Sequence, residues 1–334
     1  MPKRRRVPPV IRPGSRKPTT RWDEERRSQL LVMALGAAVL IAVAAIAIFG
    51  YYQTQIRPKG ETVLRVGDRS FNLDYLERRL RYDIREGNTT YAASLSQATS
   101  LLLNEVGQEE LLRQGAPEKG VDLSDEAIDA EIRRQESVPD DADQKTFATA
   151  YRKAVRDSGL STEAYRDVIA VGMAGPAIQS KFGEEAPKTA DQVRFRAIVL
   201  TTEDDAKATL ERLRNGEDFA TVAGEVSLDT ASREKGGEVD WTPRGVVDSA
   251  LDQALFSLEV GQISDIITGQ TALFIVQVLE RQDQRETTDS QRSILASRAE
   301  QEWLSQLEQR LGVATSLSDA QTNSLLKVVQ SEAG

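Results

Sequence analysis

Apolar and polar positions divide most of the chain into a helical block, a mixed block and a second helical block. In the first block, 61–186, the run VLRVGDRSF alternates around a Gly67-Asp68 turn, which is typical of a β-hairpin. From Leu73 onward, apolar side chains recur every three or four residues, and the spacing continues through 92–114. This spacing places apolar side chains on one face of an amphipathic helix, so we expect a mostly helical domain.

The second half of this block contains two further helix starts. Ser124 and Ser161 each precede an amphipathic run, and a serine there can accept a hydrogen bond from a free backbone N–H of the first turn. A looser, acidic patch lies between them at 138–144. The block shows no catalytic combination of residues, and it is therefore expected to be a structural or binding domain.

The mixed block, 190–282, alternates strand and helix patterns. VRFRAIVL predicts a strand, and EDDAKATLERLRNG and DFATVAGEVS predict two helices. After a glycine-containing loop, VDSALDQALFSLEVG predicts a third helix that Gly261 stops, and SDIIT and ALFIVQVLE predict two closing strands. Helical spacing then returns over 286–330, where we expect C-terminal helices.

The N-terminal part contains one long apolar run. LLVMALGAAVLIAVAAIAIF carries no charge, and a helix of about twenty residues rises ~30 Å, the thickness of a bilayer's hydrocarbon core. We therefore predict a transmembrane helix over 30–52. Basic residues flank spans on the cytoplasmic side, so 1–29 is predicted to be a disordered cytoplasmic tail. The alternative is a cleaved signal peptide, since Ala45 and Ala47 form a small-x-small cleavage pattern.

Charge and composition narrow the classes of function. Residues 1–29 hold ten Lys or Arg against three Asp or Glu, a net charge of +7. Since the whole chain has a net charge of −9, the remaining residues carry −16. An acidic body argues against nucleic acid as the main partner. The chain has no cysteine and no histidine, which excludes disulfides, thiol catalysis, serine–histidine pairs and nearly every zinc site. We expect neither a metal nor a cofactor.

Residues 190–282 resemble a parvulin-type peptidyl-prolyl isomerase domain. NGEDFATVAGEVSLDTASREKGGEVDW is similar to that family's ordered Gly, Phe, Ser-x-Asp, Gly-Gly and Trp/Phe positions, and ALDQALFSLEVGQIS is similar to its helix that ends before Gly-x-Ile-Ser. The resemblance implies a four-stranded antiparallel sheet with flanking helices. Gly236 and Gly237 would lead into a strand that carries Trp241, at a place where positive φ or a close backbone approach suits glycine.

The resemblance also locates the expected site. Twisting an X-Pro bond breaks no bond, so a catalyst needs an apolar slot for the ring and polar groups that favour the twisted amide. The family supplies two histidines, which fall here on Ala197 and Phe274, so we expect weak or no isomerase activity and a large–small pair across neighbouring strands. The remaining substrate-binding positions are the acidic Asp229, expected without histidines to cap or shape a loop, Val247 and Leu251 of the ring pocket, and the hydroxyl of Thr271.

The flanks resemble envelope foldases of the SurA, PrsA and PpiD kind. DLSDEAIDAEI and GLSTEAYRDVI look like that group's N-terminal chaperone region, and AEQEWLSQLEQRLGV looks like its returning helix, which would pack on 61–186. The expected fold class is therefore α+β: a mostly helical chaperone lobe, a parvulin-like domain with a four-stranded antiparallel sheet, and one N-terminal transmembrane helix.

This resemblance implies a chaperone or foldase anchored in a bacterial cell membrane, with its folded part outside the cytoplasm. The implied partners are unfolded or newly exported polypeptides, the membrane through 30–52, and the secretion machinery. Two alternatives stay open. The chain is then either an active peptidyl-prolyl isomerase or a non-enzymatic scaffold subunit of an envelope complex.

Overall fold

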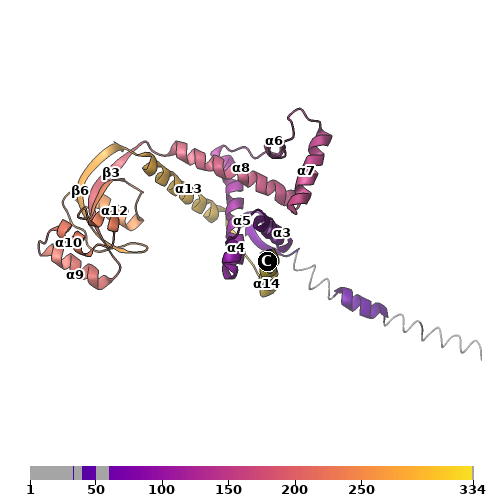
Figure 1. Cartoon of the computed structure of the whole chain (residues 1–334), viewed down its shortest axis with the longest axis horizontal. Coiled ribbons are helices and arrows are strands. Elements are labelled where there is room, and N and C mark those ends of the chain that lie inside the picture. Colours follow the sequence, from indigo (N-terminus) through magenta and orange to yellow (C-terminus); the bar gives the residue numbers. More distant parts are fainter. Residues whose placement is uncertain (1–32, 34–39, 50–59, 333–334) are drawn as a thin grey trace, which may run out of the picture. The chain divides into compact units, whose positions relative to one another are not determined.

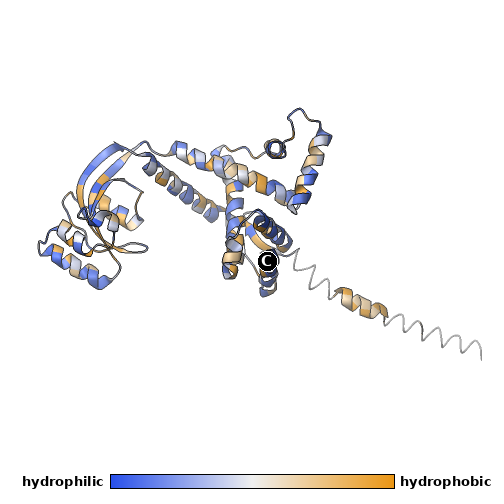
Figure 2. Cartoon of the chain, in the orientation of Figure 1, coloured by the Kyte–Doolittle hydropathy of each residue, from blue (hydrophilic) through white to orange (hydrophobic). Residues whose placement is uncertain are grey.

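The computed structural model describes residues 33, 40–49 and 60–332. Residues 40–49 are helical and mostly apolar (Figure 2), and their side chains are exposed. No helix among the described residues is both long enough and apolar enough to cross a bilayer. The predicted span over 30–52 is described only at its centre, and the predicted tail over 1–29 lies outside the described residues.

A compact unit begins at Thr62 and opens with a three-stranded sheet. Its strands are antiparallel in the order β2-β1-β7: β1 Thr62–Val66, β2 Arg69–Asn72 and β7 Val313–Thr315. The predicted hairpin is thus confirmed, and Gly67 takes a positive φ of 58° in its turn. Strand β7 was not predicted, because three residues are too short to show an alternating pattern.

Six helices and two 3-10 turns follow the hairpin and form, with the C-terminal helices, what we call the helical lobe. They are α3 Leu73–Arg85, α4 Thr90–Ala93, η2 Leu95–Gln97, α5 Ala98–Gly115, η3 Ala116–Lys119, α6 Asp125–Gln135, α7 Gln144–Ser158 and α8 Thr162–Glu185. Asn72, Ser124 and Ser161 accept hydrogen bonds from the first turns of α3, α6 and α8, as the sequence predicts.

Two helical predictions need correction. Helix α7 was missed, although it has an apolar stripe at helical spacing that consists of alanines, aromatics and one valine: Phe147, Ala150, Tyr151, Ala154 and Val155. Asp143, inside the acidic patch, caps it by accepting a hydrogen bond from Thr146 N at 2.7 Å. The predicted continuous helix over 92–114 is instead interrupted near Ser94, and only α5 is regular.

A buried ionic cluster joins α3 to α5. Arg79 donates through Nε to Asp83 at 2.7 Å and through both terminal nitrogens to Glu109. Burial raises the pKa of Asp83 to about 6, although the Arg79 guanidinium acts in the opposite direction. Tyr91 donates to Glu105 on the same side, so three carboxylates share one guanidinium.

The C-terminal helices return to the helical lobe. They are α13 Asp289–Leu311, which packs against α8 and α5, and α14 Asp319–Glu332, which packs against α3 and α5 (Figure 1). Gly115 permits the close approach of α5 and α13. A Cβ at this position would lie 2.5 Å from Leu307 Cδ1 and 2.6 Å from Trp303 Cζ2.

Between α8 and α13 the chain forms a second sheet with helices on both faces, which we call the sheet unit (Figure 1). The strands are antiparallel in the predicted four-stranded arrangement, with the order β4-β3-β6-β5: β3 Thr189–Leu200, β4 Glu238–Pro243, β5 Ile267–Thr268 and β6 Leu273–Glu286. The helices are α9 Glu203–Arg214, α10 Phe219–Val226, α11 Thr230–Arg233 and α12 Ser249–Ser257.

Alternation along the central strands separates two small cores. Ile198, Leu200 and Ile275 face helices α9 and α10, while Phe195, Ala197 and Val276 face α12. Two boundaries differ from the prediction. Helix α12 ends at Ser257 rather than near Gly261, and only two residues of the run SDIIT pair as β5.

Candidate functional site

The glycine pair fixes strand β4 against the first histidine position of the family. Gly236 and Gly237 have φ of 66° and 80°, and Ala197 N donates to Gly237 O at 2.9 Å. A Cβ on Gly237 would lie 2.6 Å from Ala197 O, a backbone atom that cannot move aside without disturbing β3. The pair is therefore required by both backbone conformation and the close approach of the strands.

Ala197 and Phe274 lie on the same face of the sheet but are not direct neighbours. In the register of β3 and β6, Ala197 stands opposite Val276, and Phe274 stands opposite Val199. Ala197 is buried, and Phe274 is partly buried against the same small core. The Phe274 ring lies against Gly269, just after strand β5. A Cβ on Gly269 would be only 2.6 Å from Cε2 of this ring. The two residues form a diagonal pair, and no imidazole faces this part of the sheet.

Asp229 lies at a helix start. Its carboxylate accepts hydrogen bonds from Ala231 N at 3.3 Å and from Ser232 Oγ at 2.5 Å, which makes it the N-cap of α11. Ser227 Oγ accepts from Val199 N at 3.2 Å and holds the same loop onto β3. The geometry gives Asp229 a structural task at the position where the family has its acidic residue.

The ring-pocket positions belong to α12 and the loop before it. Leu251 is buried, 5 % exposed, in the core between α12 and the sheet, and Val247 packs on that core from the loop. Arg298 of α13 donates through Nη2 to Val247 O at 2.5 Å. No sequence pattern indicates this contact, since the two residues are 51 positions apart and neither lies in a recognisable motif.

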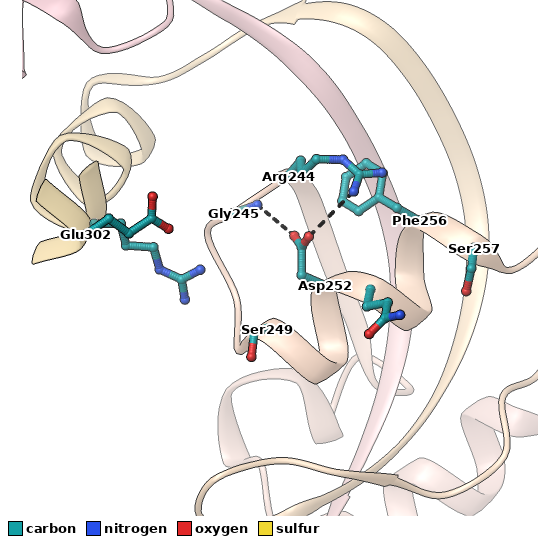
Figure 3. Close-up of a pocket in the computed structure, with 9 residues that line it drawn as sticks. Arg244, Gly245, Ser249, Asp252, Phe256, Ser257 and Glu302 are labelled. Atoms are coloured by element: carbon teal, nitrogen blue, oxygen red, sulfur yellow. Dashed lines mark hydrogen bonds and ion pairs between the residues drawn. The ribbon is translucent and has the colours of Figure 1, made fainter. Parts of the chain in front are cut away.

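A cavity of about 450 Å³ opens where α12 meets α13 (Figure 3). Asp252 accepts a hydrogen bond from Gly245 N at 2.7 Å, and the Arg244 guanidinium lies over the Phe256 ring at 4.2 Å. Glu302 approaches from α13 on the other side of the opening (Figure 3), and Arg298 of α13 also lines the cavity. The cavity therefore offers hydrogen-bond donors, acceptors and one aromatic surface.

Thr271 is exposed and lines a neighbouring cavity of about 490 Å³. This second cavity shares Ser249, Arg298 and Glu302 with the first. The structure thus separates the predicted site residues. Thr271 borders open space, Ala197 and Leu251 are core, and Asp229 caps a helix.

Serine hydroxyls and carboxylates both line the first cavity, at Ser249, Ser257, Asp252 and Glu302. Within the described part of the chain, no group of three or more acidic residues could hold a metal ion. Trp241, the large residue expected on β4, is only partly buried, with the Arg285 guanidinium 4.6 Å from its ring centre. Its backbone oxygen accepts from Gln291 Nε2 at 2.7 Å, which ties β4 to α13.

A four-stranded antiparallel sheet with this order of helices and this glycine-led strand defines the sheet unit as a parvulin-type domain. Residues 183–282 match the PPIC-type PPIASE domain family, and residues 24–179 match the SurA-like N-terminal domain family. The chain therefore contains both domains, and its homologues are foldases and chaperones of the PrsA, SurA and PpiD types.

Individual comparisons cover parts of each protein. The chain is 27 % identical over 175 residues to foldase protein PrsA of Caldanaerobacter subterraneus, covering 52 % of this chain and 55 % of that protein. It is 34 % identical over 154 residues to chaperone SurA of Methylobacillus flagellatus, covering 41 % and 35 %. The crystal structure of PrsA from Bacillus anthracis aligns with a TM-score of 0.38 at 18 % identity, over 70 % of this chain and 97 % of that chain. The chain thus spans between a third and somewhat over half of the length of these two curated relatives.

Proposed function

We propose that this protein is a membrane-anchored foldase whose outer part binds unfolded or newly exported polypeptides. Two observations support the proposal: the SurA-like and PPIC-type domains occur in one chain, and the relatives carry the names chaperone and foldase. The uncharged run within 30–52 supplies the anchor, and the basic residues before it put the folded part outside the cytoplasm. The PpiD relative of Haemophilus ducreyi is named periplasmic, which agrees with this location.

We further propose that the parvulin domain serves mainly in binding and has little isomerase activity. The observation that carries this is the pair Ala197 and Phe274, which leaves apolar side chains where the family has imidazoles. Electrostatic stabilisation of a transition state needs preorganised polar groups, and removing one such donor commonly costs 10²–10³-fold in rate. Asp229 does not replace them, because its carboxylate is engaged in capping α11.

Clients would contact the cavities between α12 and α13. Their polar linings include Arg298, Glu302 and Thr271, and the aromatic ring of Phe256 lies beside them. Such a mixed surface binds polypeptide backbone and side chains weakly and with little sequence preference, which suits a protein that must release its clients.

The test is an aggregation assay with the full chain in phosphatidylcholine nanodiscs. A chemically unfolded client is diluted into buffer with or without the discs, and light scattering is followed. The proposal predicts slower aggregation at near-equimolar chain, and a weaker effect for an Arg298→Ala, Glu302→Ala variant than for a Lys181→Ala, Glu184→Ala variant on exposed α8. Unchanged aggregation together with no binding of unfolded segments would exclude the chaperone function.

The second candidate function is prolyl isomerisation, and the match to the PPIC-type family favours it. Val247, which is only partly buried, keeps an apolar side chain beside the sheet, and desolvation alone lowers the barrier of a reaction that transfers no proton. This candidate would be supported if the chain accelerated cis–trans exchange of an X-Pro peptide. The Val247→Asp variant should then lose both the acceleration and the binding of the peptide.

A further inference from the structure

A third cavity, outside the parvulin domain, lies in the helical lobe between α3, α7 and the start of α8. It measures about 300 Å³ and is lined by three arginines and three apolar or aromatic side chains: Arg78, Arg152, Arg156, Tyr151, Val155 and Leu160. None of these residues lies at the family site or at the junction of α12 and α13.

Two of the three arginines of this cavity differ from most other arginines of the lobe. Helix α7 carries four Lys or Arg and one Asp, although the chain after residue 29 has a net charge of −16. Most lobe arginines are matched by carboxylates, as Arg69 is by Asp167 and Arg79 by Glu109. Arg152 and Arg156, in contrast, form no ion pair with any described carboxylate.

The nearby groups leave these two guanidiniums available. Arg152 donates through Nε to Ala148 O at 3.0 Å, which uses one of its five N–H groups. Asp157, the neighbouring carboxylate on α7, pairs with Lys153 at 2.7 Å. Asp74 pairs with Arg78, the third arginine of the lining, at 2.9 Å. The hydrogen bond from Lys153 and, more weakly, the charge of Arg156 lower the pKa of Asp157, so Arg156 shares this carboxylate only at longer range, and Arg152 forms no ion pair within the described chain.

The rest of the lining is mostly apolar and includes the hydroxyl groups of Tyr151 and Thr162. Leu160 is 5 % exposed, and Val155 packs on the core that α6, α7 and α8 share. The Tyr151 ring stacks on Phe147 with centroids 5.8 Å apart, which holds α7 rigid at this point. The turn at Gly159, with φ of 72°, ends α7 and closes one side of the cavity.

We propose that this cavity binds acidic segments of unfolded polypeptides, taking a carboxylate on Arg152 and Arg156 and an adjacent apolar side chain on Val155 and Leu160. The inference rests on the proposed function, to which it adds a preferred client chemistry. An arginine–carboxylate contact is charge-assisted and geometrically specific, and the small volume selects a short segment rather than a folded protein.

The experiment measures peptide binding to the full chain in phosphatidylcholine nanodiscs by fluorescence anisotropy. One labelled peptide alternates Glu and Leu, and its partner carries Gln at every Glu position. The test variant is Arg152→Gln with Arg156→Gln, and the matched control is Lys181→Gln with Lys207→Gln, which removes the same charge from exposed positions. We expect the test variant to bind the acidic peptide about tenfold more weakly, the control less than about twofold, and both to bind the Gln peptide like the wild type.

Three results would overturn the inference. Equal affinity of wild type and test variant for the acidic peptide would show that the cavity is not the site, and equal losses in both variants would reveal a general charge effect. Competition by phosphatidylglycerol vesicles that depends on Arg152 and Arg156, without a preference for the acidic peptide, would assign the arginines to lipid phosphate instead. Binding of the Gln peptide and the aggregation assay report the proposed function separately, so loss of acidic preference alone rejects only this inference.

Discussion

Replacing Gly237 with alanine tests whether the glycine pair is required by the structure. An alanine at φ of 80° incurs strain of ~1–2 kcal/mol, because its Cβ approaches the following carbonyl. The same Cβ would lie 2.6 Å from Ala197 O, and overpacking against atoms that cannot yield costs ~1–3 kcal/mol more. Gly237→Ala is therefore expected to lower the free energy of unfolding of the sheet unit by ~3 kcal/mol.

Gly216→Ala is the matched control, since it isolates the conformational part of the effect. Gly216 follows α9 with φ of 89°, and a Cβ there meets nothing within 4 Å. Its loss should be ~1 kcal/mol, from strain alone. The difference of ~2 kcal/mol between the two variants is the contribution of the close contact between β4 and β3.

The assay is urea denaturation of residues 62–334, which form one compact unit. In a Trp303→Phe background the fluorescence of Trp241, on β4, reports the sheet unit. With an m-value of ~2 kcal/mol per molar urea, the midpoint should fall by ~1.5 M for Gly237→Ala and by ~0.5 M for Gly216→Ala. Equal shifts for the two variants would refute the steric argument, and an unchanged midpoint for Gly237→Ala would refute the requirement for glycine altogether.

Three further predictions concern the lobe and its junction with the sheet unit. Gly115→Ala should lower the free energy of unfolding by ~1–2 kcal/mol, because its Cβ would collide with Leu307, whereas Gly172→Ala on α8 should raise it by ~0.5–1 kcal/mol; urea titration checks both signs. Asp83, with a folded-state pKa of about 6, stabilises the fold fully only below its ordinary pKa near 4, and this stabilisation is lost as pH rises through 6. Between about pH 4.5 and about pH 7, the wild type should lose ~2 kcal/mol of its free energy of unfolding, and Asp83→Asn should abolish this loss. If the free energy of unfolding of the variant depended on pH as in the wild type, the prediction would be contradicted. Arg298→Met should speed amide hydrogen exchange over 244–248, since it removes the bond to Val247 O; protection equal to the wild type would show that α13 does not hold this loop.

Local signals in the sequence were sufficient for most elements. The hairpin at Gly67 and the helix starts at Ser124 and Ser161 are confirmed, because turn and cap chemistry acts within three or four residues. The four-stranded sheet is confirmed as well, because the parvulin resemblance fixed the order of the elements around the glycine pair. Helix α7 was missed although it carries such a signal, since its apolar stripe is built from alanine, aromatic and valine residues rather than leucines.

The candidate site was less accessible to prediction. Whether Leu251 faces a slot or the core depends on how α12 packs on the sheet, and its periodicity is the same in both cases. The contributions of Arg298 and Glu302 depend on the return of α13 to the sheet unit, a long-range contact without a motif. The roles of Ala197, Phe274 and Thr271 in binding clients remain predictions, which the register and exposure of these residues locate but do not test.

The central claim is that the chain binds unfolded polypeptide through a parvulin domain that has lost its imidazoles. The most direct measurement is NMR exchange spectroscopy on a proline-containing peptide with and without the full chain in nanodiscs, since one set of spectra reports both binding and cis–trans exchange. The account predicts broadened peptide signals and an exchange rate within about twofold of the uncatalysed rate, which has a time constant of tens of seconds or more. Exchange accelerated a hundredfold or more, or sharp peptide signals with no sign of binding, would contradict it.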